Sequence, residues 1–285
     1  MRIIVPTRPQ RGLPASVAAA ARICAALVLA ACAHRDPPLP PPPVHGGGQT
    51  LFRILHDQCV PNERARGNPA PCALVVMDQR GDQSGDQSGD QNGGAARGYV
   101  LLKDRVGVAQ YLLMPTRRIT GIEDPALLEP EGVNYFARAW DQRTVLDARL
   151  GHPLERTRVS ITVNSIYGRS QDQLHLHLDC LDADVAEALR RADDIGGPWS
   201  RAVVTLKGRR YHLRWIEGDR APPDLFELLA QEMPGARGNM GAWTLALVGA
   251  QRRGGAPGFV ALAARADPLR GDRGSAEELQ DHSCR

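Results

Sequence analysis

The feature that most constrains the fold is a strictly alternating stretch in the middle of the chain. Leucine alternates with polar residues from position 173 to position 179. A period of two indicates a β-strand with one buried and one open face. Alternate residues on one face lie roughly 7 Å apart, so the pattern predicts two imidazoles and a carboxylate on one exposed surface. The polar positions are Gln173, His175, His177 and Asp179.

The remaining pattern predicts an α+β fold of antiparallel strands and helices. A strand at 159–163 leads through the turn 164–170 into the alternating strand 173–180, so these two strands are expected to pair. Further strands are expected at 73–77, 99–103, 106–114, 203–206, 211–215, 243–248 and 259–263. Helices are expected at 51–59, 134–150, 182–191 and 223–233, with a short helical segment from Asp124-Pro125.

Two short connections predict β-hairpins. Asp104-Arg105 would join the strand 99–103 to the strand 106–114. Lys207-Gly208 would join the later pair of strands in the same way. Connections of two residues are typical of antiparallel neighbours.

The N-terminus has the pattern of an export signal. Arginines precede a short apolar run at 23–31, and Cys32 follows Leu29-Ala30-Ala31. This order is typical of a secretory signal, and its end resembles the bacterial lipobox, in which the cysteine is lipidated. The alternative is an uncleaved membrane anchor, although the run is short for a span of about 20 residues. Either way, residues 1–32 would tie the protein to a membrane outside the cytoplasm, and residues 33–49, rich in proline and glycine, would form a tether.

The cysteines fit an oxidising compartment. Besides the two cysteines of the leader, the chain has four, and four cysteines permit three pairings. We favour Cys59–Cys72, which closes a short loop, and Cys180–Cys284, which would pin the C-terminus beside the His-x-His strand. A zinc site is disfavoured because no C-x-x-C spacing occurs.

Charge and repeats argue against some classes of function. The formal net charge of +3 is nearly balanced and indicates no nucleic-acid partner. A tandem tetrapeptide repeat at 81–94 carries aspartates that suggest calcium binding. Its phase does not match an EF-hand loop, which also needs a closing glutamate. We interpret the repeat as a low-complexity, disordered insertion.

The paired histidines have three chemical interpretations. They are structural, or they chelate a metal ion with Asp179 as third ligand, or one of them attacks phosphorus. A neutral imidazole is a good nucleophile when an acceptor fixes the proton on its other nitrogen. Hydrogen-bond donors for a phosphoryl group are available in the adjoining turn, at Asn164, Ser170 and Gln171.

A family resemblance narrows these alternatives. Asn164, Gln171 and the run His175-Leu176-His177-Leu178 have the spacing of the histidine-triad superfamily of nucleotide hydrolases and transferases. From Leu51 to Cys284 the chain resembles the bacterial CDP-diacylglycerol pyrophosphatase family. The third histidine of the triad is absent, and Asp179 stands in its place. The matching stretches include Cys59-Val60-Pro61-Asn62, Gly98-Tyr99-Val100-Leu101-Leu102-Lys103-Asp104, Leu112-Leu113-Met114-Pro115-Thr116 and Leu279-Gln280-Asp281-His282-Ser283-Cys284.

The resemblance implies a fold and a reaction. The domain 50–285 would have a HIT-like antiparallel sheet with flanking helices, with a second half of further strands and helices. It would hydrolyse CDP-diacylglycerol to CMP and phosphatidate in phospholipid metabolism, without a metal ion or other cofactor. His177 would attack the phosphorus bonded to cytidine, and water would then release CMP from the cytidylyl-histidine. His175 would contact the phosphoryl oxygens or orient its neighbour. Substrate binding would fall to Asn164, Ser170, Gln171 and Asp179.

The expected partners are CDP-diacylglycerol in the membrane and water, with no nucleic acid and no obligate protein partner. The expected location is the periplasmic side of the bacterial cell membrane, where a tether at Cys32 raises the effective concentration of a bilayer lipid. Two alternatives remain. One is a nucleotide pyrophosphatase of broader specificity that uses the same histidines. The other is a non-catalytic lipoprotein that binds metal or nucleotide.

Overall fold

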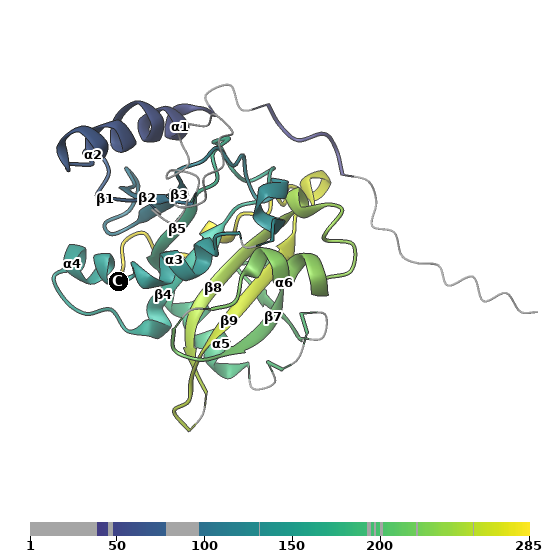
Figure 1. Cartoon of the computed structure of the whole chain (residues 1–285). Helices are drawn as coiled ribbons and strands as arrows, with labels where there is room; N and C mark the ends of the chain where they lie inside the picture. Colours follow the sequence, from purple (N-terminus) through teal and green to yellow (C-terminus); the bar gives the residue numbers. More distant parts are fainter. Residues whose placement is uncertain are drawn as a thin grey trace, which may run out of the picture. The chain divides into compact units, whose positions relative to one another are not determined.

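A single nine-stranded sheet forms the centre of the described chain, and every neighbouring pair of strands is antiparallel (Figure 1). The strand order is β1-β2-β3-β5-β4-β8-β9-β7-β6. The strands are β1 Leu74–Val76, β2 Tyr99–Lys103, β3 Tyr111–Pro115, β4 Val159–Val163, β5 Leu176–Cys180, β6 Ala202–Leu206, β7 Arg209–Glu217, β8 Trp243–Gln251 and β9 Pro257–Arg265.

The helices are short and flank this sheet. They are α1 Thr50–Ile54, α2 Val60–Arg66, α3 Tyr135–Asp141, α4 Thr144–Leu150, α5 Ala183–Arg191 and α6 Leu225–Glu232. A π-helical turn η1 (Leu55–Cys59) joins α1 to α2. Single 3₁₀ turns are η4 Pro125–Leu128, η5 Arg156–Arg158, η6 Met240–Ala242, η7 Pro268–Arg270 and η8 Ala276–Leu279.

The structure is a computed structural model that describes residues 39–44, 48–77, 97–130, 132–192, 195–196, 198–199, 202–220, 222–252 and 254–285. These residues belong to one unit, Leu39–Arg285. The predicted leader 1–32 and the repeat 81–94 lie outside them. Within the described ranges, no helix combines the length and the apolar character needed to cross a bilayer.

The described part of the proposed tether contacts the folded domain. Tyr167 Oη donates to the carbonyl oxygen of Pro40 at 2.7 Å. The backbone N–H of Asp172 donates to the carbonyl oxygen of Gly48 at 2.6 Å. Leu39 packs against the largest apolar cluster.

The predicted α+β class is confirmed, and most predicted elements are present. The strand 159–163 pairs with β5, the His-x-His strand, although β5 begins at Leu176 and the predicted strand positions 173–175, including His175, precede it. Lys207 and Gly208 turn between β6 and β7 with φ values of +50° and +80°. Both preferred disulfides, Cys59–Cys72 and Cys180–Cys284, are formed.

The connection between β2 and β3 is longer than predicted. Strand β3 begins at Tyr111, and residues 104–110 form a loop rather than a two-residue turn. Lys103 Nζ donates to the carbonyl oxygens of Asp104 at 2.7 Å and Gly107 at 3.0 Å. These bonds fold the loop back onto the end of β2. The prediction that the second strand begins at residue 106 is therefore wrong, because it begins at Tyr111.

The predicted helix 134–150 is two helices, and the first predicted helix is longer than expected. α3 ends at Asp141 and α4 begins at Thr144. In the first turn of α4, the backbone N–H groups of Val145 and Leu146 bond to carbonyls three residues back, which is the tighter 3₁₀ pattern. At the start of the domain, helical structure continues beyond residue 59 to the end of α2.

The two faces of the sheet carry different apolar cores. One face packs under α3 and α6 through a large cluster that includes Phe136, Trp140 and Phe226. The other face carries two smaller clusters. One lies beneath α1 and α2, which cover the β1–β3 end of the sheet in Figure 1, and the other lies beneath α5.

The two smaller clusters flank the His-x-His strand. Leu112 of the first cluster pairs with His177 across β3 and β5. His177 pairs with Thr162, which pairs with Ala246 of the second cluster. Because directly paired residues share a face of the sheet, His177 stands on a polar strip between two apolar patches.

Candidate active site

His177 is held through one ring nitrogen, and its other ring nitrogen has no partner. Nδ1 lies 3.2 Å from Glu277 Oε1 and 2.9 Å from Gln110 Nε2. Gln110 Nε2 also donates to Glu277 Oε1 at 3.0 Å. Nε2 of His177 is buried and has no hydrogen-bond partner among the described residues.

This arrangement favours one tautomer of His177. With the proton on Nδ1, the ring is attracted by the charge of the Glu277 carboxylate 3.2 Å away, although the two groups form no hydrogen bond. The opposite tautomer accepts from Gln110 instead, which sets a lone pair 3.2 Å from the oxygen of Glu277 and leaves a buried Nε2–H without an acceptor. An unpaired buried donor costs about 1–3 kcal/mol. The lone pair of Nε2 is therefore free to attack.

His175 is fixed in a similar way by the backbone. Its Nδ1 lies 2.6 Å from the carbonyl oxygen of Gln173, so it donates there. The His175 ring lies 4.9 Å from the His177 ring, measured between centroids, with the planes inclined at 65°. Burial, together with the neighbouring His177, lowers the pKa of His175 to about 4. His175 is consequently a neutral ring near neutral pH.

Glu277 is itself held as a carboxylate. Asn164 Nδ2 donates to its Oε2 at 3.1 Å, and Asn164 Oδ1 accepts from Ser275 Oγ at 3.0 Å. Burial alone would raise the pKa of Glu277, but His177, Gln110 and Asn164 outweigh it, and the net shift is downward. Burial lowers the pKa of His177, and Glu277 opposes that shift.

Asp179 forms a second buried ion pair with the C-terminal segment. Its side chain is fully buried, and Oδ2 lies 2.8 Å from His282 Nδ1. The hydrogen bond to Asp179 raises the pKa of His282. The adjacent disulfide Cys180–Cys284 fixes the segment that carries His282.

The expectation of an open polar face is wrong. Every residue of β5 is buried, and His177 is only 5% exposed. The loop 104–110 and the segment 275–284 meet over this face: the N–H of Val108 donates to the carbonyl oxygen of His282, and Gln280 Nε2 donates to that of His177. The alternating pattern correctly separated the faces, but it did not show that distant segments cover the polar one.

The turn residues divide between the site and its surroundings. Asn164 reaches the histidines through Glu277. Gln171 Oε1 instead accepts from the N–H of Leu51 at 3.2 Å, and Ser170 is exposed. No hydrogen bond joins Ser170 or Gln171 to either histidine in the described structure.

The histidines and Asp179 do not gather as metal ligands. The group of three potential ligands found among the described residues is Asp179 with Cys180 and Cys284. A disulfide joins these two cysteines, so neither offers the thiolate that binds metal. Asp179 is engaged by His282 instead.

Three important residues were missed from the sequence: Gln110, Glu277 and His282. The available signal was the predicted Cys180–Cys284 bridge. That bridge places the last ten residues beside the His-x-His strand, so the acidic and imidazole side chains near Cys284 were candidates to face it. Gln110 carried no such signal, because it lies in a segment predicted to be a strand.

The fold and the site define an α+β protein with a histidine–carboxylate network buried on one face of an antiparallel sheet. The chain belongs to the CDP-diacylglycerol pyrophosphatase family, whose model matches residues 46–285. A protein from Yersinia pestis named CDP-diacylglycerol pyrophosphatase is 39% identical over 236 residues, which cover 82% of this chain and 83% of that protein. The family resemblance is thus confirmed, and the wider histidine-triad assignment stays a prediction.

Proposed function

We propose that this protein hydrolyses CDP-diacylglycerol to CMP and phosphatidate through a nucleotide-bound histidine. The observation that carries the mechanism is the His177 ring, whose Nδ1 lies 3.2 Å from the Glu277 carboxylate and whose Nε2 is buried without a partner among the described residues. Membership in the pyrophosphatase family supports the substrate.

The first step exchanges one bond to phosphorus for another. His177 Nε2 attacks the phosphorus bonded to cytidine, an N–P bond forms, and the bond from that phosphorus to the bridging oxygen breaks. Phosphatidate leaves with the electron pair. Glu277 stabilises the positive charge that develops on the ring, as a carboxylate does beside a nucleophilic imidazole.

The second step restores the enzyme. Water attacks the same phosphorus, the N–P bond breaks, and CMP leaves. Nε2 of the neutral His175 ring carries no proton, because the ring proton is on Nδ1, which donates to the carbonyl oxygen of Gln173. It becomes a donor to a phosphoryl oxygen only after taking up a proton, which the negative charge of an entering pyrophosphate favours.

Substrate can reach His177 only if its cover moves. Nε2 has essentially no exposed surface, so the loop 104–110 and the segment 275–284 must separate when the nucleotide enters. Both segments lack long regular elements, which is typical of parts that gate active sites.

The test is to trap the covalent intermediate. Radiolabelled CDP-diacylglycerol, quenched with base within one turnover, should leave cytidylate on the peptide that contains His177. We expect His177→Ala to abolish both the label and turnover, and His175→Ala to slow turnover while retaining label. Label on His175 in the wild-type protein would move the nucleophile to that ring, and full turnover by His177→Ala would contradict the covalent route.

We also propose that the protein acts at the outer side of a bacterial cell membrane, anchored through Cys32. The lipobox-like sequence and the two disulfides, which require an oxidising compartment, support this location. Radioactive palmitate should label the wild-type protein and not Cys32→Ala. Equal labelling of both would contradict a lipid at this cysteine.

A further inference from the structure

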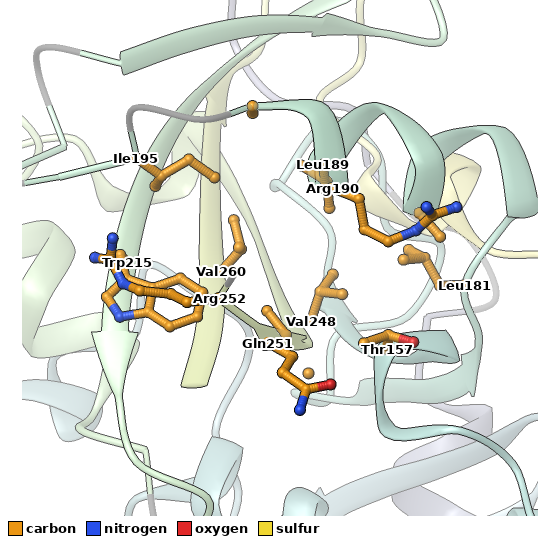
Figure 2. Close-up of a pocket in the computed structure, with 14 residues that line it drawn as sticks. Thr157, Leu181, Leu189, Arg190, Ile195, Trp215, Val248, Gln251, Arg252 and Val260 are labelled. Carbon is orange, nitrogen blue, oxygen red and sulfur yellow. The ribbon is translucent and has the colours of Figure 1, made fainter. Parts of the chain in front are cut away.

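A pocket with both apolar and polar lining residues lies beneath α5, outside the histidine site. Its volume is about 190 Å³. Figure 2 shows Val248 and Val260 between α5 on one side and Trp215 on the other. Ligand pockets combine apolar walls with a few polar groups, and the apolar part of this one suits hydrocarbon. The apolar side chains that line it include Leu181, Leu189, Ile195, Trp215, Val248 and Val260.

The cavity opens on the same face of the sheet as the histidines. Asp179 pairs with Ser160, and Ser160 pairs with Val248. Val248 pairs in turn with Val260. Paired residues share a face, and neighbouring strands lie about 4.8 Å apart. Two such steps, roughly 10 Å, separate the strand of the histidines from Val248 on the floor of the pocket, and a third leads to Val260.

A wider hollow continues from the cavity towards the C-terminal segment. The two share Thr157, Arg190 and Arg252, and the hollow extends to Cys284 and Arg285. It therefore reaches the C-terminal end of the segment that covers the histidines.

The hollow is rich in positive charge. Glu155 is the acidic side chain that lines it. Three of its arginines pair with acids outside the lining: Glu187 pairs with Arg190 and Arg191, and Glu217 pairs with Arg252 at 3.5 Å. Arg252 lies over the Trp215 ring, 4.5 Å from its centroid, as Figure 2 shows. The arginines of the hollow are Arg158, Arg190, Arg191, Arg252 and Arg285.

We propose that the pocket beneath α5 holds part of an acyl chain of the lipid substrate while the pyrophosphate lies at His177. The proposal rests on the proposed function. One leaflet of a bilayer is about 15 Å of hydrocarbon, so an acyl chain has the length to extend from a phosphorus near His177 to the cavity. An apolar pocket beside a cationic hollow matches an anionic lipid, which carries both chemistries in one molecule.

The kinetic test fills the cavity and compares two substrates. Ala250 lines the cavity on the same face of β8 as Val248 and is partly buried. Ala250→Phe should lower kcat/KM for long-chain CDP-diacylglycerol about tenfold, while kcat/KM for the soluble dibutanoyl analogue stays within about twofold. Ala188→Phe is the matched control, because Ala188 is a partly buried alanine of α5 outside the cavity lining. Equal losses with both substrates, or no loss with either, would overturn the proposal.

A direct binding test separates this proposal from the proposed function. Vesicles containing phosphatidate with a photoactivatable group near the end of one acyl chain should cross-link to the peptide that carries Val248 and Ala250. Ala250→Phe should remove this cross-link, and Ala188→Phe should retain it. Cross-linking elsewhere would overturn the cavity proposal even if turnover is normal.

A wild-type protein that cross-links here but hydrolyses no substrate would leave the cavity assigned and refute the proposed function. If sedimentation shows a dimer that Ala250→Phe dissociates, the occupant is a second copy of this chain and the lipid proposal fails.

Discussion

At the scale of single residues, Glu277 decides what His177 can do. In the proposed mechanism its partly buried carboxylate, 3.2 Å from Nδ1, attracts the proton to that nitrogen and leaves the lone pair on Nε2. The carboxylate remains charged because Asn164 and Gln110 donate to it. Glu277 does not touch the reacting phosphorus in this scheme, so it is a positioning residue for the nucleophile.

Glu277→Gln should separate this role from a structural one. The amide keeps the size of the side chain but removes its charge, and we expect kcat to fall about 10²–10³-fold with little change in KM. Because Glu277 opposes the burial that lowers the pKa of His177, its neutralisation should lower that pKa further. The acidic limb of the kcat/KM profile should therefore move to lower pH.

The matched control for this prediction is Glu278→Gln. Glu278 is the next residue, and its side chain pairs with Arg209 and Tyr211 instead of with the histidines. This variant should keep the wild-type pH profile. An unmoved acidic limb in Glu277→Gln would contradict the assigned role, even if its rate falls.

At the scale of elements, the sequence predicts the strands well, but it does not predict which distant segments pack over them. The alternation around His177 depends on residues adjacent in the chain, so the strand and its two faces were predictable. Gln110 lies 67 positions from His177, and His282 lies 103 positions from Asp179. A pattern of period two reports that the two faces differ in polarity, and it holds no information about which distant segment packs on either face.

The loop 104–110 shows the same limit of local sequence patterns. Its two valines are spaced two residues apart as on one face of a strand, yet Val106 and Val108 are 54% and 50% exposed. The loop folds back because Lys103 finds carbonyl acceptors within it, and because the N–H of Val108 bonds to His282. The last contact requires the C-terminal segment, which a local pattern cannot include.

At the scale of the whole molecule, the polar site exists because the sheet is wider than either apolar patch on its second face. The clusters beneath α1–α2 and beneath α5 cover the two ends and leave the middle strands to polar side chains. The C-terminal segment closes this middle region and brings Glu277 and His282 onto it. A single disulfide, Cys180–Cys284, joins that segment to the end of the His-x-His strand.

Removal of this disulfide should therefore affect activity and stability together. Its cysteines are 104 residues apart, and a bridge over a loop of that size contributes about 2–5 kcal/mol to the free energy of unfolding. We expect Cys180→Ser/Cys284→Ser to lose stability on that scale in urea titrations. Its kcat should also fall more than tenfold at a temperature where circular dichroism shows it folded, because Glu277 is no longer held beside His177.

The control is Cys59→Ser/Cys72→Ser, whose bridge spans 13 residues and joins η1 to the loop before β1. This variant should lose stability and keep kcat. If both folded variants retain full kcat, the position of Glu277 does not depend on the bridge, and the packing of Gln280 and His282 alone is sufficient to hold the segment over the histidines.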